Sequence, residues 1–558
     1  MAPLRDRNLR EALHHRRKAM DAEYSHWDAH FRELREWISP ARGRFVASDK
    51  RGDSSINKRI LDSTATMALR TLRAGLMSGV TSPSRPWFRL GLRGPDTEES
   101  HAVKMWLHEV QRRMYEIMRG SNIYRMLDTC YGDLGLYGTF CGMIVPDFDD
   151  VLRGHHFPIG TYRIGEDGNG RVIAMQREIS LPVRTIVETW GYENVSDAVQ
   201  REWDRGDYYT THTICHSVEK RADGDPAALK ASRKPWASVY WEKARESSDS
   251  FLQIGGHAVK PLVAPRWEAV EGEAWSTGSP GMVALGDVRS LQVMQQEKAI
   301  AIQKMHNPPL IGAGMSARDT ARNIPGGVTL VNVQDLRTSG LRPVYEVKPD
   351  IQGLLLDIQE TQRRVDAAFY RDLFQMAAIS LEGRSQITAR EIAERHEEKL
   401  MALGPVLESL DHELLQPLIE GCFAFMQDAD ILPPAPEDIV GAPIKVEYVS
   451  LLAQAQKAIG VGAIERTVGF AGSMAQLDPE AIAMLNTEAI IREFADQVGP
   501  PPGILRSPEE MEQRRQASAA AAQQAQMVEA AQPLAGAAKL IAETQSLGVD
   551  AMQRGMPL

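Results

Sequence analysis

The sequence predicts an α+β protein that is mainly helical, and three observations lead to this prediction. Apolar side chains recur at helical spacing through most of residues 5–136 and again through 388–425. Between these segments, residues 139–270 carry short runs rich in β-branched and aromatic residues, separated by Gly, Pro and Asp clusters. Two further helical segments enclose a Gly- and Pro-rich stretch at residues 310–349.

The composition of the 558-residue chain fits about three or four folded domains by length. Hydrophobic residues make up 43% of it and the mean hydropathy is -0.31, as in soluble proteins with substantial cores. No stretch approaches the roughly 20 apolar residues of a membrane helix, and the charged N-terminal segment lacks the apolar core of a signal peptide. We therefore expect a protein that stays in the cytoplasm where it is made, without a membrane partner.

The charge balance argues against tight, general DNA binding. Lys and Arg number 64 against 74 Asp and Glu, for a net charge of -10. A protein that grips DNA usually has a basic excess, whereas a mostly acidic wall would let a duplex pass. The four cysteines form no CxxC pair and have no His at zinc-finger spacing, so we expect buried free thiols.

Four helices are predicted before the β-rich region. The first covers residues 5–37 and ends at Ser39-Pro40; its apolar stripe includes Leu13 and Phe31. The others are predicted over residues 58–79, 97–119 and 121–136. Strands are then predicted over residues 140–145, 171–179, 236–243 and 251–256, with a helix at 181–191.

The centre of the sequence predicts two antiparallel helices with a small β-containing tip. The first runs from Asp287 to His306, where Asn307-Pro308-Pro309 ends it. The tip contains two strand-like pieces, 327–333 and 343–347, and a second helix runs from 350 to about Met376. Residues 377–386 are small and polar and end the helical periodicity.

The next segment is a long helix over residues 388–425. A capping box, Thr388 with Glu391, opens it, and Gly404-Pro405 predicts a kink in its middle. A strand follows over IKVEYVS, and then helices to about residue 497. After a proline break, Ala-, Gln- and Glu-rich residues 509–532 predict a further helix.

Four segments occur in an informative order. Residues 69–90 read LRTLRAGLMSGVTSPSRPWFRL, and the long helix runs from ITAREI (387–392) to ELLQPLIE (413–420). Residues 446–456 read VEYVSLLAQAQ, and VGPP at 498–501 precedes LRSPEE at 505–510. Together these segments resemble the portal proteins of tailed bacteriophages, the head-to-tail connectors of short-tailed phages.

The resemblance implies a portal fold with wing, stem, clip and C-terminal crown, assembled as a ring. The expected regions are N-terminal helices and α+β wing at 1–286, stem helix 1 at 287–309, clip at 310–349, stem helix 2 at 350–376, channel loop at 377–386, kinked helix and rest of the wing at 387–497, and helical crown at 498–558.

The resemblance also implies a function. A homo-oligomeric ring, expected to be a dodecamer, would sit at one capsid vertex of the virion after assembly in the host cytoplasm. Double-stranded DNA would pass through its channel during packaging and ejection. Terminase, the major capsid protein or scaffold, and a tail adaptor would be its partners. A different structural ring of the virion, such as a tail adaptor or tube protein, is the alternative.

No catalytic, cofactor or metal motif withstands inspection, so we expect a protein that is not an enzyme. The GxGxxA match at residues 312–317 follows two prolines and lacks its helix, so we predict a turn of the tip there. His396-Glu397 and His412-Glu413 begin like HExxH but lack the second His, and we interpret both as solvated helix faces. No Walker A motif is present.

The resemblance places candidate DNA contacts in the channel loop and on the stem. Arg384 is the leading candidate in the loop, with Glu382, Ser385 and Gln386 beside it; pairing of Arg384 with Glu382 or a neighbouring subunit is nearly as well supported. The stem candidates are Lys298, Lys304, Arg363, Arg364 and Arg371, for which inter-subunit ion pairs are an equal alternative. The clip-interface candidates are Arg318, Arg322, Arg337 and Arg342.

Overall fold

The computed structural model describes most of the chain before residue 310 and separate segments after it. The described residues are 9–45, 59–92, 100–244, 250–308, 310–313, 328–331, 342–343, 351–374, 403–436, 444–448, 464, 467–473, 485–487, 489–491, 494, 510–521 and 523. The chain divides into two compact units. The first comprises residues 1–91, 110–434 and 444–463, and the second 92–109, 435–443 and 464–558.

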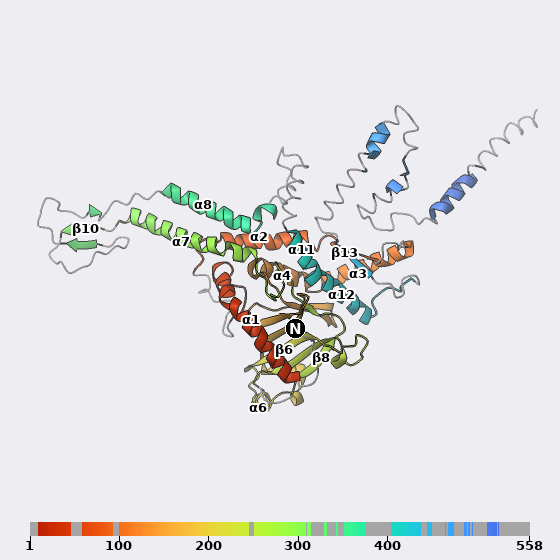
Figure 1. The fold of residues 1–558 in the computed structure, drawn as a ribbon, viewed down its shortest axis with the longest axis horizontal. Coiled ribbons are helices and arrows are strands. Elements are labelled where there is room, and N and C mark those ends of the chain that lie inside the picture. Colours follow the sequence, from red (N-terminus) through yellow and green to blue (C-terminus); the bar gives the residue numbers. More distant parts are fainter. Residues whose placement is uncertain are drawn as a thin grey trace, which may run out of the picture. The chain divides into compact units, whose positions relative to one another are not determined.

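The N-terminal helix α1 (Leu9–Trp37) lies along one face of the main sheet (Figure 1). Its apolar stripe is buried from Leu13, through Met20 and Tyr24, to Phe31. The helix ends just before Ser39-Pro40, as the sequence predicts. Burial of this stripe against the sheet stabilises a helix whose other face is charged.

Three helices follow where the sequence predicts them, with starts that differ by two to six residues: α2 (Thr64–Gly79), α3 (His101–Gly120) and α4 (Ile123–Tyr137). Helix α4 is buried along nearly its whole length and ends at Gly138, which adopts a left-handed φ of 73°. Small residues allow α2 to pack closely on α4, because a Cβ at Gly135 would overlap Leu72.

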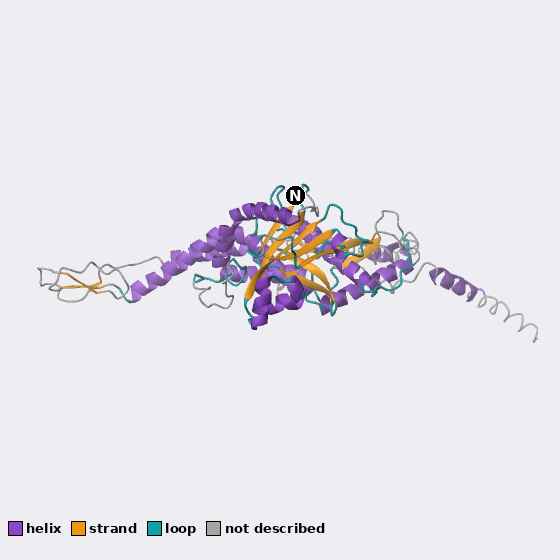
Figure 2. Ribbon diagram, turned by 90° about the horizontal axis from the view of Figure 1, so that it is seen from below, coloured by secondary structure: helices purple, strands orange, loops and turns teal. Residues whose placement is uncertain are grey.

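Two antiparallel sheets form the β-rich region predicted from the sequence (Figure 2). The larger has the order β4-β5-β6-β7-β8, with β4 (Tyr162–Glu166), β5 (Val172–Pro182), β6 (Thr211–Lys220), β7 (Trp236–Glu242) and β8 (Gln253–His257). The smaller has the order β3-β2-β9, with β2 (Gly142–Asp147), β3 (Val151–His156) and β9 (Leu262–Val263). Strands β3, β4, β6 and β9 were not predicted from the sequence.

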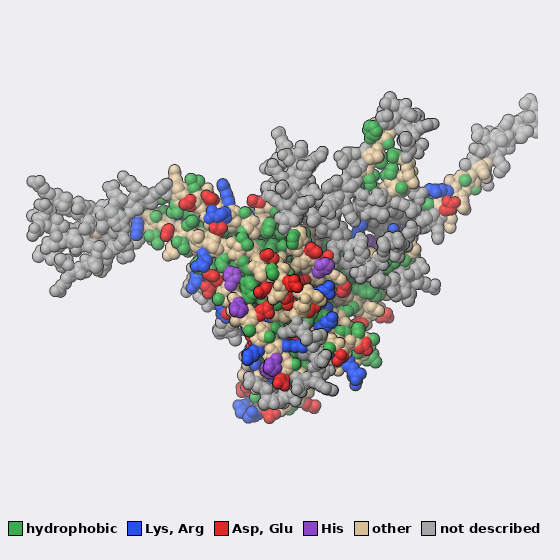
Figure 3. Space-filling model, viewed as in Figure 1, with side chains coloured by type: hydrophobic (Ala, Val, Ile, Leu, Met, Phe, Trp, Pro, Cys, Tyr) green, Lys and Arg blue, Asp and Glu red, His purple; other side chains and the backbone are tan. Residues whose placement is uncertain are grey.

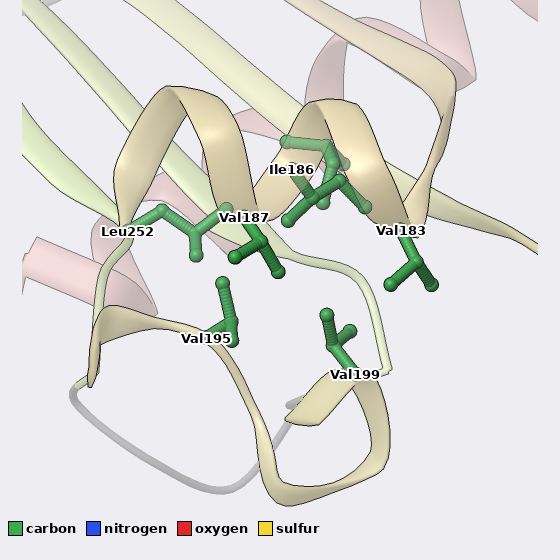
Figure 4. Packing of buried hydrophobic residues seen from close by; sticks show 7 residues of the cluster. Val183, Ile186, Val187, Val195, Val199 and Leu252 are labelled. Carbon is green, nitrogen blue, oxygen red and sulfur yellow. The ribbon is translucent and has the colours of Figure 1, made fainter. Parts of the chain in front are cut away.

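Two short helices cover the other face of the larger sheet at its end. They are α5 (Val183–Trp190), which was predicted, and α6 (Asp197–Arg205), which was not. A valine-rich cluster joins them to the sheet (Figure 4): its buried members are Val183, Ile186, Val187, Val195, Val199, Ile214 and Leu252. On the opposite face, Leu13 of α1 packs against Val239 and Trp241. The sheet is therefore covered on both faces.

The two central helices are α7 (Pro280–His306) and α8 (Ile351–Ala368). Helix α7 starts seven residues before the predicted Asp287, because the Ser279 hydroxyl accepts a hydrogen bond from the Met282 amide at 3.1 Å and Pro280 follows it in the first turn. Helix α8 does not continue unbroken to Met376, and that prediction is wrong. Tyr370 interrupts it with a φ of 54°, and Phe374 after the break lies against Gly75.

The tip between these helices contains three short strands: β10 (Leu310–Ala313), β11 (Val328–Val331) and β12 (Arg342–Pro343). The central strand β10 pairs in parallel with β11 and antiparallel with β12. A strand thus occupies residues 312–313, where we predicted a turn, and for these two residues the prediction is wrong; residues 314–317 lie outside the described part of the chain. Both residues pair with β11, which gives this Gly-containing segment backbone partners.

The described part of the long helix begins with α11 (Gly404–Leu410), continues as a π-helix (Asp411–Leu415) and ends as α12 (Gln416–Asp428). Pro405 occupies the first turn of α11, where a missing N–H is tolerated. The irregular hydrogen bonding instead precedes Pro417, which cannot donate to the carbonyl four residues earlier. The predicted capping box and the segment leading to Gly404 lie outside the described residues.

Further predictions from the sequence are confirmed. Trp87 and Phe88 are core anchors: both are buried beside Tyr115, whose hydroxyl accepts hydrogen bonds from both backbone amides. Phe88 begins strand β1 (Phe88–Leu92), which pairs with the predicted later strand, β13 (Ile444–Tyr448).

The cysteines are free; Cys130, Cys141 and Cys422 are buried and Cys215 is half-buried. Residues 510–521 are helical, within the predicted 509–532.

Candidate functional site

Helices α7 and α8 lie side by side and extend from the α+β body of the first unit (Figures 1 and 2). Burial along α7 changes abruptly: Ala284, Leu285, Val288 and Leu291 are buried, whereas Val293 and the residues beyond it are half-buried or exposed. In α8, Ile358, Thr361 and Val365 are buried against it. One end of the helix pair is therefore rooted in a core and the other is exposed in the single chain.

A network of amides and one carboxylate ties this root to the start of α2. Gln292 of α7 accepts hydrogen bonds from the Leu61 and Asp62 amides at 2.7 and 2.8 Å. The Asp62 carboxylate accepts from Gln295 of α7 at 2.8 Å and from Gln362 of α8 at 2.9 Å. Burial alone would raise the pKa of Asp62, but these hydrogen bonds, together with those from Thr64, hold it below its usual value. Asp62 thus joins both helices while ionised.

The exposed part of the helix pair carries a set of uncovered apolar side chains, which we call the stem stripe. Figure 3 shows hydrophobic side chains over α7 and α8 between charged ones. The members are Val293, Ile300, Ile302, Met305, Leu355 and Leu356, each at least 39% exposed. Such a collection on neighbouring helices is typical of a surface that another molecule covers.

The structure divides the predicted stem cations into two groups. Arg364 pairs with Asp287 at 3.0 Å and with Glu360 at 3.4 Å, so it braces α8 against α7. Arg371 pairs with Asp366 at 2.9 Å, beside the break in α8. These two guanidinium groups therefore already have carboxylate partners within their own subunit.

The other three stem cations have no carboxylate partner among the described residues. Arg363 is exposed, and Lys298 and Lys304 are half-buried on α7. The structure thus brings four of the five predicted stem cations onto α7 and α8 and places Arg371 just after α8. Three of the five, Lys298, Lys304 and Arg363, have no intramolecular ion pair within the part of the chain described.

The remaining predicted site residues lie outside the part of the chain whose side chains are described. These are Glu382, Arg384, Ser385 and Gln386 in the predicted channel loop, and Arg318, Arg322 and Arg337 in the predicted clip. Arg342 is described by its backbone, which lies in strand β12. Its strand pairs with Ile311 and Leu310 of β10.

A buried ion-pair cluster at the π-helical part of the long helix was not predicted from the sequence. Glu413 lies in the π-helix and binds the guanidinium of Arg266, a side chain that is only 3% exposed. Glu166 of β4 pairs with the same guanidinium at 3.2 Å, and Ser409 donates to the Arg266 carbonyl at 2.7 Å. Our interpretation of Glu413 as part of a solvated helix face is therefore wrong. No spacing rule links these residues, because Arg266 lies in an irregular segment.

The described ranges contain no group of three or more His, Cys, Asp or Glu side chains placed to hold a metal ion. No helix within them is long and apolar enough to cross a membrane. Asp147 and Asp150, in the acidic turn between β2 and β3, both pair with Arg153. Both of these carboxylates are therefore already paired with an arginine.

Comparisons with known proteins place the sequence in a family. A sequence model of the family described as "Bacteriophage head to tail connecting protein" matches residues 10–505. The chain is 38% identical to the "Portal protein" of Salmonella phage epsilon15 over 94% of both chains. It is 40% identical to the "Probable portal protein" of Bordetella phage BPP-1, over 87% of this chain and 86% of that one.

A solved structure, the "Neck of empty GTA particle computed with C6 symmetry", matches 78% of this chain and 93% of its own at 11% identity, with a TM-score of 0.35. Family membership rests on the sequence matches, which span nearly the whole chain at close to 40% identity. The chain therefore belongs to the bacteriophage head-to-tail connecting protein family.

Proposed function

We infer that this chain is the portal protein of a tailed phage. It forms the channel at one capsid vertex through which DNA enters during packaging and leaves at infection. The observation that carries this inference is a helix pair rooted in an α+β body, in a chain that matches the family over residues 10–505. Chains of this family act as structural components, in a ring at the head–tail junction of the virion.

The stem stripe supports a ring in which α7 and α8 of one subunit pack against those of the next. A closed ring needs two different faces on each subunit, and an apolar helix face meets that need when a second copy covers it. We propose twelve subunits. The tip formed by β10, β11 and β12 is too small to build a core alone, so we propose that it interlocks with neighbouring tips and contacts terminase and the tail adaptor.

We propose that the channel meets DNA through few, weak cationic contacts. Arg363, Lys298 and Lys304 are the stem candidates, since Arg364 and Arg371 are engaged within the subunit. Arg384, beside Glu382, is the candidate in the loop that follows α8. Salt-screened contacts of single charges, repeated around a ring, let a duplex slide past without being held. The capsid protein or scaffold would contact the outer α+β region.

A phage with a nonsense codon early in this reading frame tests the function. Loss of a portal should leave capsids that contain no DNA, because the genome has no entry. Loss of a tail adaptor or tube protein would instead leave capsids that fill with DNA and then lack tails. Electron microscopy and nuclease-protected DNA content distinguish the two, and DNA-filled heads would contradict the portal assignment. Restoring the chain from a plasmid should restore packaging.

A further inference from the structure

A cavity of about 400 Å³ lies in the first unit, away from the exposed part of the stem. It is lined by the loop that follows α1, by α2 and α4, and by β3. Its charged lining residues are Arg42, Arg70, Arg73, Asp133 and His156. Three arginines thus face a cavity that contains one carboxylate.

The inner end of the cavity is buried and is formed by hydrogen-bonded side chains around Asp133. Asp133 accepts hydrogen bonds from Arg42 Nη1 at 2.6 Å and from His156 Nε2 at 2.7 Å, and its side chain is 5% exposed. Burial by itself would raise the pKa of Asp133, but the Arg42 charge and the His156 hydrogen bond hold it low. Gly132 is required beside it, because a Cβ there would overlap the Arg42 guanidinium. The carboxylate is thus ionised and fully engaged.

The outer part of the cavity has positive charge in excess. Arg73 uses its Nε atom to bind Asp128 at 2.8 Å. Arg70 is exposed, and its contact within the described residues is a long one, 3.9 Å, to the sulfur of Met67. Ser39 lines the same cavity and has no side-chain hydrogen bond among the described residues. The Arg70 guanidinium and the Ser39 hydroxyl therefore line the cavity without a hydrogen bond to an oxygen acceptor among the described residues.

We propose that this cavity binds a phosphate group, either as inorganic phosphate or in the backbone of a nucleic acid. Guanidinium groups present paired N–H donors that match the spacing of phosphate oxygens. Asp133 pairs with Arg42 and Asp128 pairs with Arg73, so Arg70 supplies the excess positive charge of the cavity, and it is accessible from solvent. A bound phosphate would join Arg70 of α2 to Arg42, which follows α1 and is held by Asp133 of α4. This inference is independent of the proposed channel function.

Isothermal titration calorimetry of the purified full chain with inorganic phosphate, at constant ionic strength against chloride, tests the proposal. Wild type should show saturable binding. Arg70→Gln should weaken that binding by about tenfold or more, the effect of losing one charged hydrogen-bond donor. Arg70 is exposed, so this variant should fold normally. Arg125→Gln, at an exposed position of α4 outside the cavity, should bind phosphate like wild type.

A short DNA duplex in the same assay distinguishes the two sources of phosphate. If a nucleic-acid backbone is the ligand, the duplex should compete with phosphate and lose affinity in Arg70→Gln. If free phosphate is the ligand, only phosphate binding should weaken, and the duplex should not compete. No saturable phosphate or duplex binding, or equal affinities of wild type and Arg70→Gln for both probes, would overturn the proposal.

Discussion

Buried charged residues hold the long helix to the α+β body. Arg266 is 3% exposed and lies between Glu413 and Glu166, with its backbone amide bound to Glu413 at 2.9 Å. Burial would lower the pKa of Arg266, but the hydrogen bond and charge of Glu413 outweigh that effect and raise it. Because a buried charge without its partner is costly, each member of this cluster depends on the others.

Replacing Arg266 should destabilise the first unit strongly. Arg266→Met leaves Glu413 and Glu166 without their cation, and we expect a loss of about 3 kcal/mol in the free energy of unfolding. Urea unfolding followed by tryptophan fluorescence measures this. Arg112→Ala serves as the control, because Arg112 pairs with Glu116 at the surface and should cost less than about 1 kcal/mol. Equal, small losses for both variants would contradict the structural role of Arg266.

Two histidines, the buried His216 and the half-buried His257, are neutral in the folded chain. Arg177 donates to His216 Nδ1 at 3.1 Å, so that nitrogen is the acceptor and Nε2 donates to Ser238 at 3.0 Å. Burial, and then the positive charge of Arg177, hold the pKa of His216 well below its usual range. At His257, burial and then Lys234 lower the pKa to about 4.

Stability should therefore fall as pH falls from 6.5 toward 4. In that range the unfolded chain binds a proton at His257 that the folded chain does not bind. Above pH 6.5 this proton has no effect, and the free energy of unfolding decreases progressively as the pH falls from 6.5 to about 4. Between pH 7 and pH 5, His257→Gln should lose about 1–2 kcal/mol less of its free energy of unfolding than the wild type loses. Urea unfolding at both pH values measures this, with exposed His15→Gln as control. An unchanged pH dependence in His257→Gln would contradict the assignment.

At the scale of elements, α7 and α8 combine a fixed root with an uncovered end. The Asp62 and Gln292 hydrogen bonds fix the root, and the stem stripe leaves the other end dependent on a neighbour. The break at Tyr370 turns the chain after α8 so that Phe369 and Leu373 are buried. The α+β body therefore buries and fixes only one end of this helix pair.

Placing a polar side chain in the stem stripe should weaken ring assembly. Leu356 is 66% exposed in the single chain, and Leu356→Asp would put a charge into the proposed interface. We expect the fraction of rings seen by mass photometry to fall at least about tenfold, since a buried unpaired charge costs more than 1.4 kcal/mol. Leu229→Asp, at a fully exposed leucine outside the stem, should assemble like wild type. Normal assembly of Leu356→Asp would place the interface elsewhere.

Arg363 and Arg384 should influence DNA without influencing the ring. Arg363→Ala and Arg384→Ala each remove a charge that we propose faces the channel, so packaged DNA length or DNA retention should change while rings persist. Arg364→Ala is the matched control, because its charge is engaged by Asp287 and Glu360. Nuclease-protected DNA per particle, measured at low and high salt, is the test. Wild-type values in both variants would contradict the proposal that these residues face DNA in the channel.

Helices with regularly spaced apolar residues, and the β-rich region, could be predicted from the sequence, because the spacing reflects the burial of one face. Strand β13 was predicted as well, and so was the end of α7, which the prolines after Asn307 indicate. The start of α7 was missed although Ser279 followed by Pro280 is a helix-start signal. The close approach of Gly281 to the Leu136 backbone depends on a segment distant in sequence. Strand β6 and the Arg266–Glu413 pair were missed because their partners are distant in sequence. The same reason hid the cavity lined by Arg42 and Arg70.

At the scale of the whole molecule, we infer that the subunit is complete only beside copies of itself. The α+β body of the first unit has cores on both faces of its sheet, so it should keep its fold in a single subunit. The stem stripe and the three-stranded tip have no comparable core among the described residues. We therefore expect the ring to form from prefolded bodies.

Electron microscopy of the purified, negatively stained protein tests the central claim most directly, with mass photometry of the same sample at micromolar concentration. We expect closed rings with a central hole and a single dominant subunit number, which we propose to be twelve. Particles of monomer or dimer mass without a central hole, at low and high salt alike, would contradict it.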